Sequence, residues 1–337
     1  MAALSWLKAY WIQTETWSDN LQLTGEQLMK PVVILGVFVA DLAFRTPRMP
    51  VMGETVIGPL FKLGPGGKGS NQAVAAKRAG AEVSFIAMLG EDAFAKIALD
   101  LYSDEGVNTD YVFQTKEQDT GAADIIIDDV TGNNAIIVVI GAAGLLGPEH
   151  VEKATSRIAE ASIFMTNFEV SSTAVKRGLE IAKAHGIPTI LNPAPATEVS
   201  LEIFALSDYA TPNETEASSF TGIQVNDAND ARKAALKLRE MGVGTALITL
   251  GEKGCYVLND NLDEHIPAFD MTGKVVETTG AGDAFNGGFA HALASGQSLR
   301  DAIRFGSATA ALSVTKPGTA PAMPSNTDIQ SLLNTGT

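Results

Sequence analysis

The sequence predicts an α/β fold, with a mostly parallel central sheet, helices on both faces and a small second group of β-strands. Short apolar runs typical of buried strands alternate with runs typical of helices, which predicts the parallel sheet. Two stretches, about 39–63 and 120–140, interrupt this alternation with short strand patterns. With 337 residues, of which 45% are hydrophobic, the chain is long enough for one large domain with a small appendage, or for two domains.

The expected elements follow in order from residue 31. The buried strands are predicted at Val32–Val37, Val83–Met88, Ser162–Thr166, Thr189–Asn192, Tyr209–Thr211 and Ala246–Leu250. Helices are predicted at 70–79, 149–160, 171–185, 227–241 and 298–312. In the second of the two interrupting stretches, Ala122–Ile127 and Asn134–Ile140 flank a polar, hairpin-like turn at 128–133.

The first thirty residues differ from the rest of the chain. All three tryptophans, Trp6, Trp11 and Trp17, lie there, and Met29 stands where the first strand would naturally start. We expect residues 1–30 to be an N-terminal extension, either the product of a start codon placed too early or a helix that packs on the body. We expect residues 31–330 to form the main domain, and removal of 1–28 to leave folding and activity largely intact.

Charge and cysteine content argue against several classes of protein. The net charge of −15 argues against a nucleic-acid or anionic-membrane partner. No apolar run approaches the ~18 residues of a membrane span. The single cysteine, Cys255, excludes an internal disulfide and fits a cytoplasmic protein, and its apolar neighbours indicate a buried packing residue. The four histidines are too scattered to suggest a metal site.

The segment 278–291 carries the strongest functional signal. Gly280, Ala281 and Gly282 leave the backbone bare just before an apolar run that is typical of a helix. Unpaired N–H groups and the helix dipole favour an anion at such an N-terminus, and the carboxylate of Asp283 lies at the same place. A phosphate held by amides beside a carboxylate suits phosphoryl transfer to a hydroxyl, because the carboxylate can take the proton of the attacking alcohol. Taken alone, the segment fits a loop with an Asp helix cap equally well.

A second glycine-rich segment, 64–72, precedes an alanine-rich helix that Gly80 is placed to end. Lys68, Ser70 and Asn71 place hydrogen-bonding groups at the mouth of this loop. Such groups suit a polyhydroxylated ligand.

The same loop also fits the dinucleotide-binding pattern G-x-G-x-x-G through Gly64, Gly66 and Gly69. That pattern would make the protein an NAD-dependent dehydrogenase. It should follow the first buried strand directly, however, whereas here it begins well after Val37 and contains the charged Lys68. The P-loop pattern G-x-x-x-x-G-K-[ST] is absent from the sequence.

The two glycine-rich segments together resemble the signatures of the ribokinase-like sugar kinases, the PfkB carbohydrate kinase family. The signatures stand here at 66–73 and 280–287, and three further segments, 192–196, 211–217 and 248–254, match in the same order. The resemblance spans about residues 31–330 and is more specific for the superfamily than for the sugar. It implies ATP-dependent phosphorylation of a primary hydroxyl of a small sugar, with ribose the leading candidate. Deoxyribose, a ketohexose, a 2-keto-3-deoxy acid and a nucleoside are the alternatives, and a non-catalytic sugar sensor is disfavoured by the intact Asp283.

The resemblance also implies roles for individual residues. Asp283 would be the catalytic base, and Gly280, Ala281 and Gly282 would complete the anion hole. The sugar would contact Asp41, Gly67, Lys68, Gly69, Ser70, Asn71, Glu169 and Asp283. ATP would contact Asn213, Thr249, Leu250, Gly251, Glu252, Lys253, Gly254, Gly282 and Ser307. Glu216 would hold Mg²⁺ through water, and Glu277, Thr279, Ser313, Lys316 and Gly318 would surround an activating K⁺. Segments 39–63 and 120–140 would form a small β-sheet lid that covers the sugar and pairs with a second subunit in a homodimer.

The sequence departs from the family pattern at several of these places. Val39 stands where ribokinases have an Asn two residues before the sugar-binding Asp, and Ala143 replaces another Asn. An apolar side chain cannot donate to a sugar hydroxyl, and a buried hydroxyl left unpaired costs ~1–3 kcal/mol. Glu277 replaces an Asp and Ala322 a Ser near the cation residues. From the sequence alone, Asn213 and Glu216 could also be a helix capping box.

Overall fold

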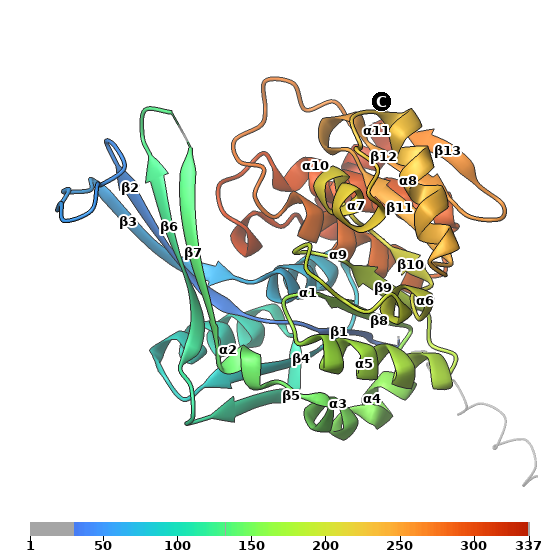
Figure 1. The fold of residues 1–337 in the computed structure, drawn as a ribbon, viewed down its shortest axis with the longest axis horizontal. Coiled ribbons are helices and arrows are strands. Elements are labelled where there is room, and N and C mark those ends of the chain that lie inside the picture. Colours follow the sequence, from blue (N-terminus) through green and yellow to red (C-terminus); the bar gives the residue numbers. More distant parts are fainter. Residues whose placement is uncertain (1–29, 132, 336–337) are drawn as a thin grey trace, which may run out of the picture.

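The computed structural model describes residues 30–131 and 133–335, so all but the last residue of the expected N-terminal extension lie outside the described residues. Within them, the main sheet has nine strands in the order β13-β12-β11-β10-β9-β8-β1-β4-β5 (Figure 1). The strands are β1 (Val32–Leu35), β4 (Val83–Gly90), β5 (Asn108–Thr115), β8 (Ile163–Asn167), β9 (Thr189–Asn192), β10 (Tyr209–Ala210), β11 (Thr245–Thr249), β12 (Cys255–Leu258) and β13 (Asp263–Ile266). All pairs from β5 to β11 are parallel, and β12 and β13 add antiparallel strands at one edge. The prediction of a mostly parallel sheet is confirmed.

Helices cover both faces of this sheet. One face carries α3 (Pro148–Lys153), α4 (Thr155–Ala159), α5 (Ser172–Ala184), α6 (Glu202–Ala205), α7 (Glu214–Thr221) and α8 (Ala228–Glu240). The other carries α1 (Lys68–Ala79), α2 (Ala93–Glu105), α9 (Ala281–Ala294), α10 (Leu299–Ser313) and α11 (Asn326–Thr335). Three short 3-10 helices lie at Ala142–Leu145, Gly251–Lys253 and Ala320–Ala322. Successive residues of β1 serve opposite cores, since Val33 packs in the first and Val32 in the second.

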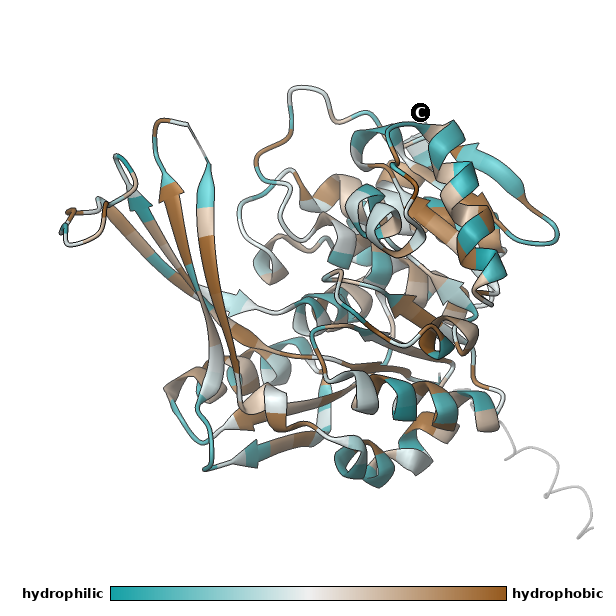
Figure 2. Cartoon of the chain, in the orientation of Figure 1, coloured by the Kyte–Doolittle hydropathy of each residue, from teal (hydrophilic) through white to brown (hydrophobic). Residues whose placement is uncertain are grey.

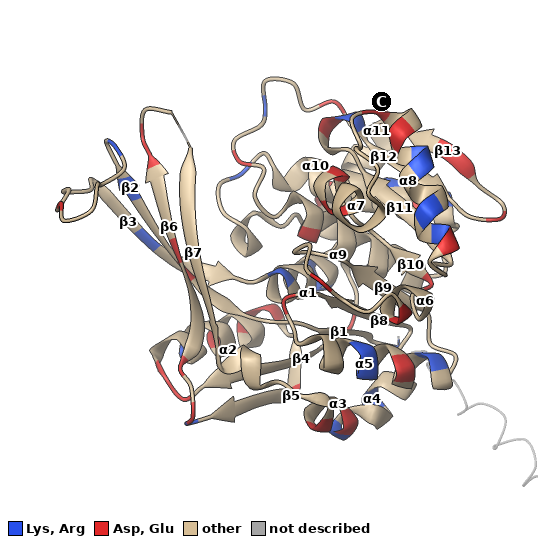
Figure 3. Cartoon of the chain, in the orientation of Figure 1, with Lys and Arg blue, Asp and Glu red and all other residues tan. Residues whose placement is uncertain are grey.

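The charged side chains gather on the outer helices, most visibly on α5 and α8, whereas the main sheet carries few of them (Figure 3). No helix within the described ranges has the length and apolar character needed to cross a membrane.

The sequence predicted one helix at 149–160, and that prediction is wrong in one respect. The helix breaks at Ala154 (φ −92°, ψ 7°) into α3 and α4. The Thr155 hydroxyl donates to the Glu152 carbonyl (2.7 Å) there, a bond that competes with helical continuation.

The second sheet is the predicted lid. Its strands are β2 (Val39–Thr46), β3 (Leu60–Gly66), β6 (Thr120–Asp128) and β7 (Asn134–Gly141), in the order β3-β2-β6-β7. The lid extends away from the body, and its strands are strongly hydrophobic (Figures 1 and 2). Several of these apolar side chains are nevertheless exposed, among them Phe61 at 49% and Ile137 at 66%. Strand β3 runs into Gly66, so the glycine-rich loop is a direct continuation of the lid.

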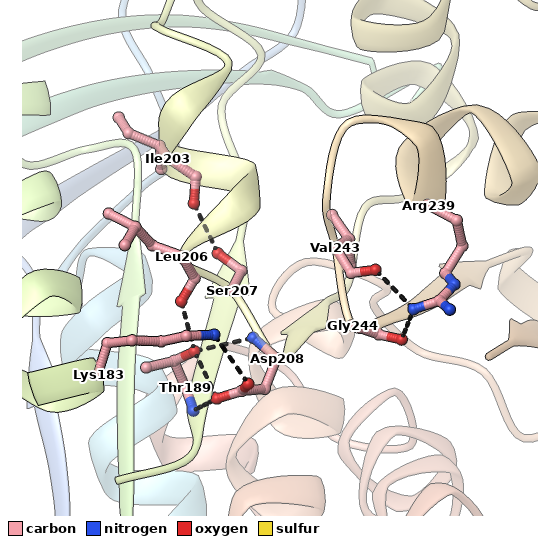
Figure 4. A network of polar contacts seen from close by, with 9 residues as sticks. All are labelled: Lys183, Thr189, Ile203, Leu206, Ser207, Asp208, Arg239, Val243 and Gly244. Carbon is pink, nitrogen blue, oxygen red and sulfur yellow. Dashed lines mark hydrogen bonds and ion pairs between the residues drawn. The ribbon is translucent and has the colours of Figure 1, made fainter. Parts of the chain in front are cut away.

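The short strands β9 and β10 are fixed at their starting ends by a network around Asp208 (Figure 4). The Asp208 carboxylate accepts from the Thr189 amide (2.9 Å) and hydroxyl (3.0 Å), and the Asp208 amide donates back to that hydroxyl (2.8 Å). Lys183 pairs with the same carboxylate, and Arg239 donates to the carbonyls of Val243 and Gly244 before β11. This network sets the register of β9 and β10, and therefore the positions of the polar residues at their other ends.

Candidate active site

The candidate active site lies where the parallel strands end. In the main sheet β1 lies between β4 and β8, so the chain order reverses at this point, which is where open α/β sheets bind ligands. The chain leaving β1 leads to Asp41, the chain leaving β8 leads to Glu169, and β9 ends at Asn192. A pocket of about 130 Å³ opens at this edge. It is lined by Lys68, Asn192, Ala194, Thr211, Asn213, Glu216, Thr249, Gly280, Gly282, Asp283 and Asn286.

The N-terminus of α9 forms one wall of the pocket. Gly280 is the N-cap residue, with φ +83°, a left-handed conformation that favours glycine. The first intrahelical bond runs from Ala284 to Gly280, so the amides of Gly282 and Asp283 precede the helical ladder and remain available for an anion. The Ala281 amide instead donates to the Thr278 carbonyl (3.2 Å). The Ala281 amide is therefore already bonded in a turn, and we expect only the amides of Gly282 and Asp283 to bind an anion.

Asp283 is not a helix cap. It lies in the first turn of α9, and its two oxygens accept from side chains of α1. Asn71 donates to Oδ2 (3.0 Å) and Gln72 donates to Oδ1 (3.2 Å). Burial raises the pKa of the Asp283 carboxyl, while Lys68 and the two amides act in the opposite direction. A carboxylate held between donors in a phosphate-sized pocket can take a proton from a nearby hydroxyl.

Two further carboxylates, Asp41 and Glu169, lie on the lid side of Asp283. Burial, together with the charges of Asp283 and Glu277, raises the pKa of Asp41 to about 6. Burial raises the pKa of Glu169 to about 7, against the opposing effect of Lys68. Glu169 accepts from the Lys68 amide (2.8 Å). Two half-buried carboxylates of raised pKa are suited to accept hydrogen bonds from a polyhydroxylated ligand.

The glycine-rich loop brings its backbone close to these groups. A side chain at Gly66 would collide with the Asp41 carboxylate, since a Cβ there would lie 2.2 Å from Oδ1. Gly67 and Gly69 follow in the same loop, and Asn71 already contacts Asp283. Ser70 does not face the site, because it is fully buried and its hydroxyl accepts from Tyr102 (3.0 Å). We therefore correct the expectation that Ser70 contacts the sugar.

Lys68 was predicted to contact the sugar, but it also lies on the nucleotide side of the site. Its side chain lines the pocket together with Asn213 and Glu216, on the side expected for the nucleotide. Burial lowers the pKa of Lys68, but the carboxylates of Asp283, Glu169 and Glu216 together outweigh burial, so the net pKa lies above its usual value. Lys68 is thus a firmly charged group between the sugar side and the phosphate side of the site.

Asn213 and Glu216 form the capping box that the sequence allowed. The Asn213 side chain accepts from the Glu216 amide (2.8 Å), and Glu216 Oε2 accepts from the Asn213 amide (2.9 Å). Both residues also line the pocket, so the structural and the functional interpretations hold together. Burial raises the pKa of Glu216. Thr249, at the end of β11, lines the pocket too and is joined to Pro212 by a backbone bond (2.9 Å).

The remaining residues expected to bind ATP, 250–254 and Ser307, are not part of the pocket lining. Gly251–Lys253 form a 3-10 turn after β11, with Leu250 buried and Gly251, Glu252 and Lys253 exposed. The Leu250 amide donates to the Gly254 carbonyl (2.7 Å), and Lys253 donates to the Asn226 carbonyl (3.0 Å). Ser307 is half-buried on α10 and is not part of the pocket lining.

Among the residues expected to hold a monovalent cation, Glu277 and Gly318 are in direct contact. The Glu277 carboxylate accepts from the Gly318 amide (2.9 Å), and the amides of Val276 and Glu277 donate to the Val314 carbonyl (2.8 and 3.2 Å). Ser313 is buried at the end of α10, and Thr279 is exposed beside Gly280. The Lys316 side chain lines a separate groove beside α11, so only its backbone belongs to this cluster. Within the described residues, no three His, Cys, Asp or Glu side chains gather as a metal site.

Sequence analysis assigned no role to four buried polar residues of the site: Gln72, Asn192, Thr211 and Asn286. Asn192 and Thr211 directly follow or end strands of the parallel sheet. Their position at strand ends is a signal that could have marked them. Gln72 lies inside an apolar helix, and only the assembled structure brings it to Asp283. Asn286 follows Asp283 in the same helix, where its side chain donates to the Gly282 carbonyl.

Comparison with known proteins identifies the family. The pfkB family carbohydrate kinase model matches residues 29–326. The chain belongs to this family.

Similar proteins include a ribokinase of Haemophilus influenzae, 38% identical over 297 residues that cover 88% of this chain and 96% of the relative. A deoxyribokinase of Salmonella typhi is 35% identical over 295 residues, covering 87% of this chain and 95% of the relative. Among solved structures, a ribokinase of Arabidopsis thaliana complexed with ribose and ATP has a TM-score of 0.84 at 32% identity. That match covers 91% of this chain and 99% of the other.

The protein is therefore an ATP-dependent sugar kinase. The dehydrogenase alternative is also excluded by the fold. Gly64 and Gly66 lie in β3, an antiparallel lid strand, and not in the turn that follows the first strand of the parallel sheet.

Proposed function

We propose that this kinase transfers the terminal phosphoryl group of ATP to the primary hydroxyl of ribose, giving ribose 5-phosphate. The observation that carries the proposal is one pocket in which Asp283, the N-terminus of α9 and Lys68 meet the nucleotide-side residues, while the charge of Asp283 acts on the carboxyls of Asp41 and Glu169. The ribokinases among its relatives support ribose as the sugar.

In this proposal, Asp41, Glu169 and Asn71 hold the sugar hydroxyls, with the backbone of Gly67 and Gly69 closing over the ring. Asp283 takes the proton of the attacking hydroxyl as its oxygen bonds to phosphorus, and ADP leaves. The amides of Gly282 and Asp283, with Lys68, stabilise the charge that develops on the phosphoryl oxygens. Asn213, Thr249–Gly254 and Ser307 contact the nucleotide.

We assign Mg²⁺ to the nucleotide side of the pocket. Glu216 fits this role, because one of its oxygens caps α7 while its carboxylate lines the pocket. A lone carboxylate matches the usual way of holding Mg²⁺, in which waters and phosphates supply most ligands. The metal would neutralise phosphate charge.

We assign K⁺ to the cluster of Glu277, Thr279, Ser313, Lys316 and Gly318. One carboxylate and several backbone carbonyls are hard oxygen donors, which suits a monovalent cation. Bound there, the ion would lie behind the amides of α9 and support their orientation.

The lid supports a proposal on assembly. Its apolar side chains Phe61, Leu63, Ile137 and Val139 are between 45% and 66% exposed, more apolar surface than a solvated sheet needs. We propose that the lid covers the sugar with one face and pairs with a second copy of the chain in a homodimer.

We place the enzyme in the cytoplasm, where its single buried cysteine would stay reduced.

One observation favours deoxyribose as a second candidate. Val39 lies on the same face of β2 as Asp41, opposite Gly66 in β3, and is buried. Ala143 is buried as well. An apolar side chain at Val39, on the face of β2 that carries Asp41, suits a sugar that lacks one hydroxyl, and a deoxyribokinase is among the relatives.

The test is an ADP-release screen across ribose, deoxyribose, ketohexoses, sugar acids and nucleosides. Ribose should give the highest kcat/KM, and deoxyribose ranking first would establish the second candidate. No ADP release with any sugar would contradict the proposed reaction.

A further inference from the structure

Behind Asp283, hydrogen bonds link five buried residues and the exposed Gly282 into a ring, which the peptide bond between Gly282 and Asp283 completes. Gln72 Nε2 donates to Asp283 Oδ1 (3.2 Å) and to Asn192 Oδ1 (3.0 Å). Asn192 Nδ2 donates to the Thr211 carbonyl (3.2 Å), and the Thr211 hydroxyl donates to Asn286 Oδ1 (2.7 Å). Asn286 Nδ2 closes the ring on the carbonyl of Gly282 (2.8 Å), the residue before Asp283.

The direction of every bond in this ring is fixed by two backbone carbonyls. A carbonyl oxygen can only accept, so Asn192 must turn its NH₂ group to Thr211 and its oxygen to Gln72. Gln72 must then present its NH₂ group to Asn192, and the same group meets Asp283. Likewise, the Gly282 carbonyl fixes the amide of Asn286.

Gln72 keeps this orientation although the oxygen of its amide is left without a hydrogen-bond partner. It is fully buried, and its own Oε1 has no hydrogen-bond partner among the described residues. Turning the amide over would give Oε1 no donor either, because it would face two acceptors. The orientation is therefore imposed by the ring.

Asn71, on the other oxygen of Asp283, is not constrained in this way. Its Nδ2 donates to Oδ2 (3.0 Å), and its Oδ1 is buried without a partner in the described part of the chain. No other side chain fixes its amide. Asn71 can therefore turn over and accept from a protonated Oδ2, whereas Gln72 cannot accept from Oδ1.

We propose that Gln72 is a positioning residue that keeps Oδ1 of Asp283 a permanent acceptor, so that the proton of the sugar hydroxyl is delivered to Oδ2. This inference rests on the proposed role of Asp283 as the base. The O–H bond of the hydroxyl breaks, an O–H bond forms at Oδ2, and the hydroxyl oxygen bonds to phosphorus as ADP leaves. The other arm of the ring, through Asn286 and Gly282, holds the peptide plane whose N–H belongs to the anion hole.

Other charged groups also face Asp283, and the test must separate them. Lys68 comes from α1, Asp41 from β2, Glu169 from the turn after β8 and Glu216 from α7, with Glu277 near Asp41. Saturating sugar occupies Asp41 and Glu169. The single-turnover rate at saturating sugar and ATP therefore reports the base more selectively than kcat/KM does.

The experiment compares Gln72→Met with the native enzyme over pH 5–9. Removing a donor to the carboxylate should raise the pKa of the base, and the acidic limb of the rate profile should move up by about one pH unit. Gln72→Asn, which keeps an amide in the core but shortens it away from Asp283, should move the limb in the same direction and serves if Gln72→Met does not fold. Thr309→Val is the matched control, because it removes a buried hydrogen bond to the Phe305 carbonyl (2.8 Å) outside the ring. The acidic limb of the rate profile of Thr309→Val should not move.

The outcomes distinguish this inference from the proposed function. A rate that falls equally at all pH values with an unmoved limb in both Gln72 variants would overturn the role of Gln72. If Asp283→Asn keeps near-native turnover, Asp283 is not the base and the proposed mechanism itself fails. Loss of turnover in Asp283→Asn, with an unmoved limb in the Gln72 variants, would overturn this inference alone.

Discussion

The main sheet and the lid sheet supply the same active site but are built in opposite ways. The main sheet is covered by helices on both faces, and its polar site residues are fixed by buried partners, as Asp283 is by Gln72 and Asn71. The lid has no helix layer over most of its length (Figure 2), and apolar residues such as Ile137 remain exposed. The difference is that the main sheet holds its polar residues in fixed geometry, whereas the lid leaves apolar surface free for the sugar and the second copy proposed above.

The strongest test of the body is Asp283→Asn. We expect turnover to fall by about 10²-fold or more, while sugar and ATP still bind, because a general base acts in the transition state. Rates of ADP formation and titration calorimetry of both substrates measure the two effects. An equal loss of sugar binding would mean that Asp283 acts mainly in the ground state.

The strongest test of the lid is Ile137→Asp. A charge placed on the exposed apolar face should weaken the proposed homodimer by about tenfold or more, since an unpaired charge resists burial. Sedimentation velocity over a concentration series measures the dissociation constant of the homodimer. Leu201→Asp, at an apolar residue that is 60% exposed on the body, is the control and should leave the association unchanged. A native protein that is monomeric at all concentrations would refute the pairing.

Val39→Asn probes the junction between the two sheets. A restored amide supplies one hydrogen bond to a sugar hydroxyl, worth ~0.5–1.5 kcal/mol, so preference for ribose over deoxyribose should rise roughly two- to tenfold. The measurement is the ratio of the two kcat/KM values in both proteins. A ratio that moves away from ribose would show that Val39 does not face the sugar.

The smallest expected effect compares one carboxylate of the lid with one of the body. The pKa values of Asp41 and Glu169 are raised in the folded protein, to about 6 and about 7. The folded state therefore binds more protons than the unfolded state between about pH 4 and 7, and the stability of the ligand-free protein should decline as pH rises through this range.

Asp41→Asn and Glu169→Gln should remove part of that decline. At pH 8 each should raise Tm by roughly 2–5 °C, and at pH 4 the difference should vanish. We expect the larger gain for Glu169→Gln, because the lid that carries Asp41 can open locally before the body unfolds. Thermal unfolding of the ligand-free proteins at both pH values is the measurement, and equal gains would argue that the lid unfolds together with the body.

Much of this site was predictable because its signals are local. Gly280 before an apolar run marks the anion site, and the alternation of strands and helices marks the parallel sheet. The exposed position of Lys253 and the buried hydroxyl of Ser70 were not predictable, since both depend on neighbours distant in sequence: Asn226 for one and Tyr102 for the other. The break at Ala154 was missed because nothing in the apolar pattern of 149–160 marks it.

By itself, the sequence determined the fold class and the family and predicted which carboxylate acts as the base, because these follow from short patterns whose physics is contained within a few turns. Only the tertiary structure decided what each polar atom faces. Gln72 and Asp283 are 211 positions apart, and their contact exists because α1 and α9 pack on the same face of the main sheet. Hydrogen-bond direction in a buried ring depends on every member at once, and no local pattern carries that information.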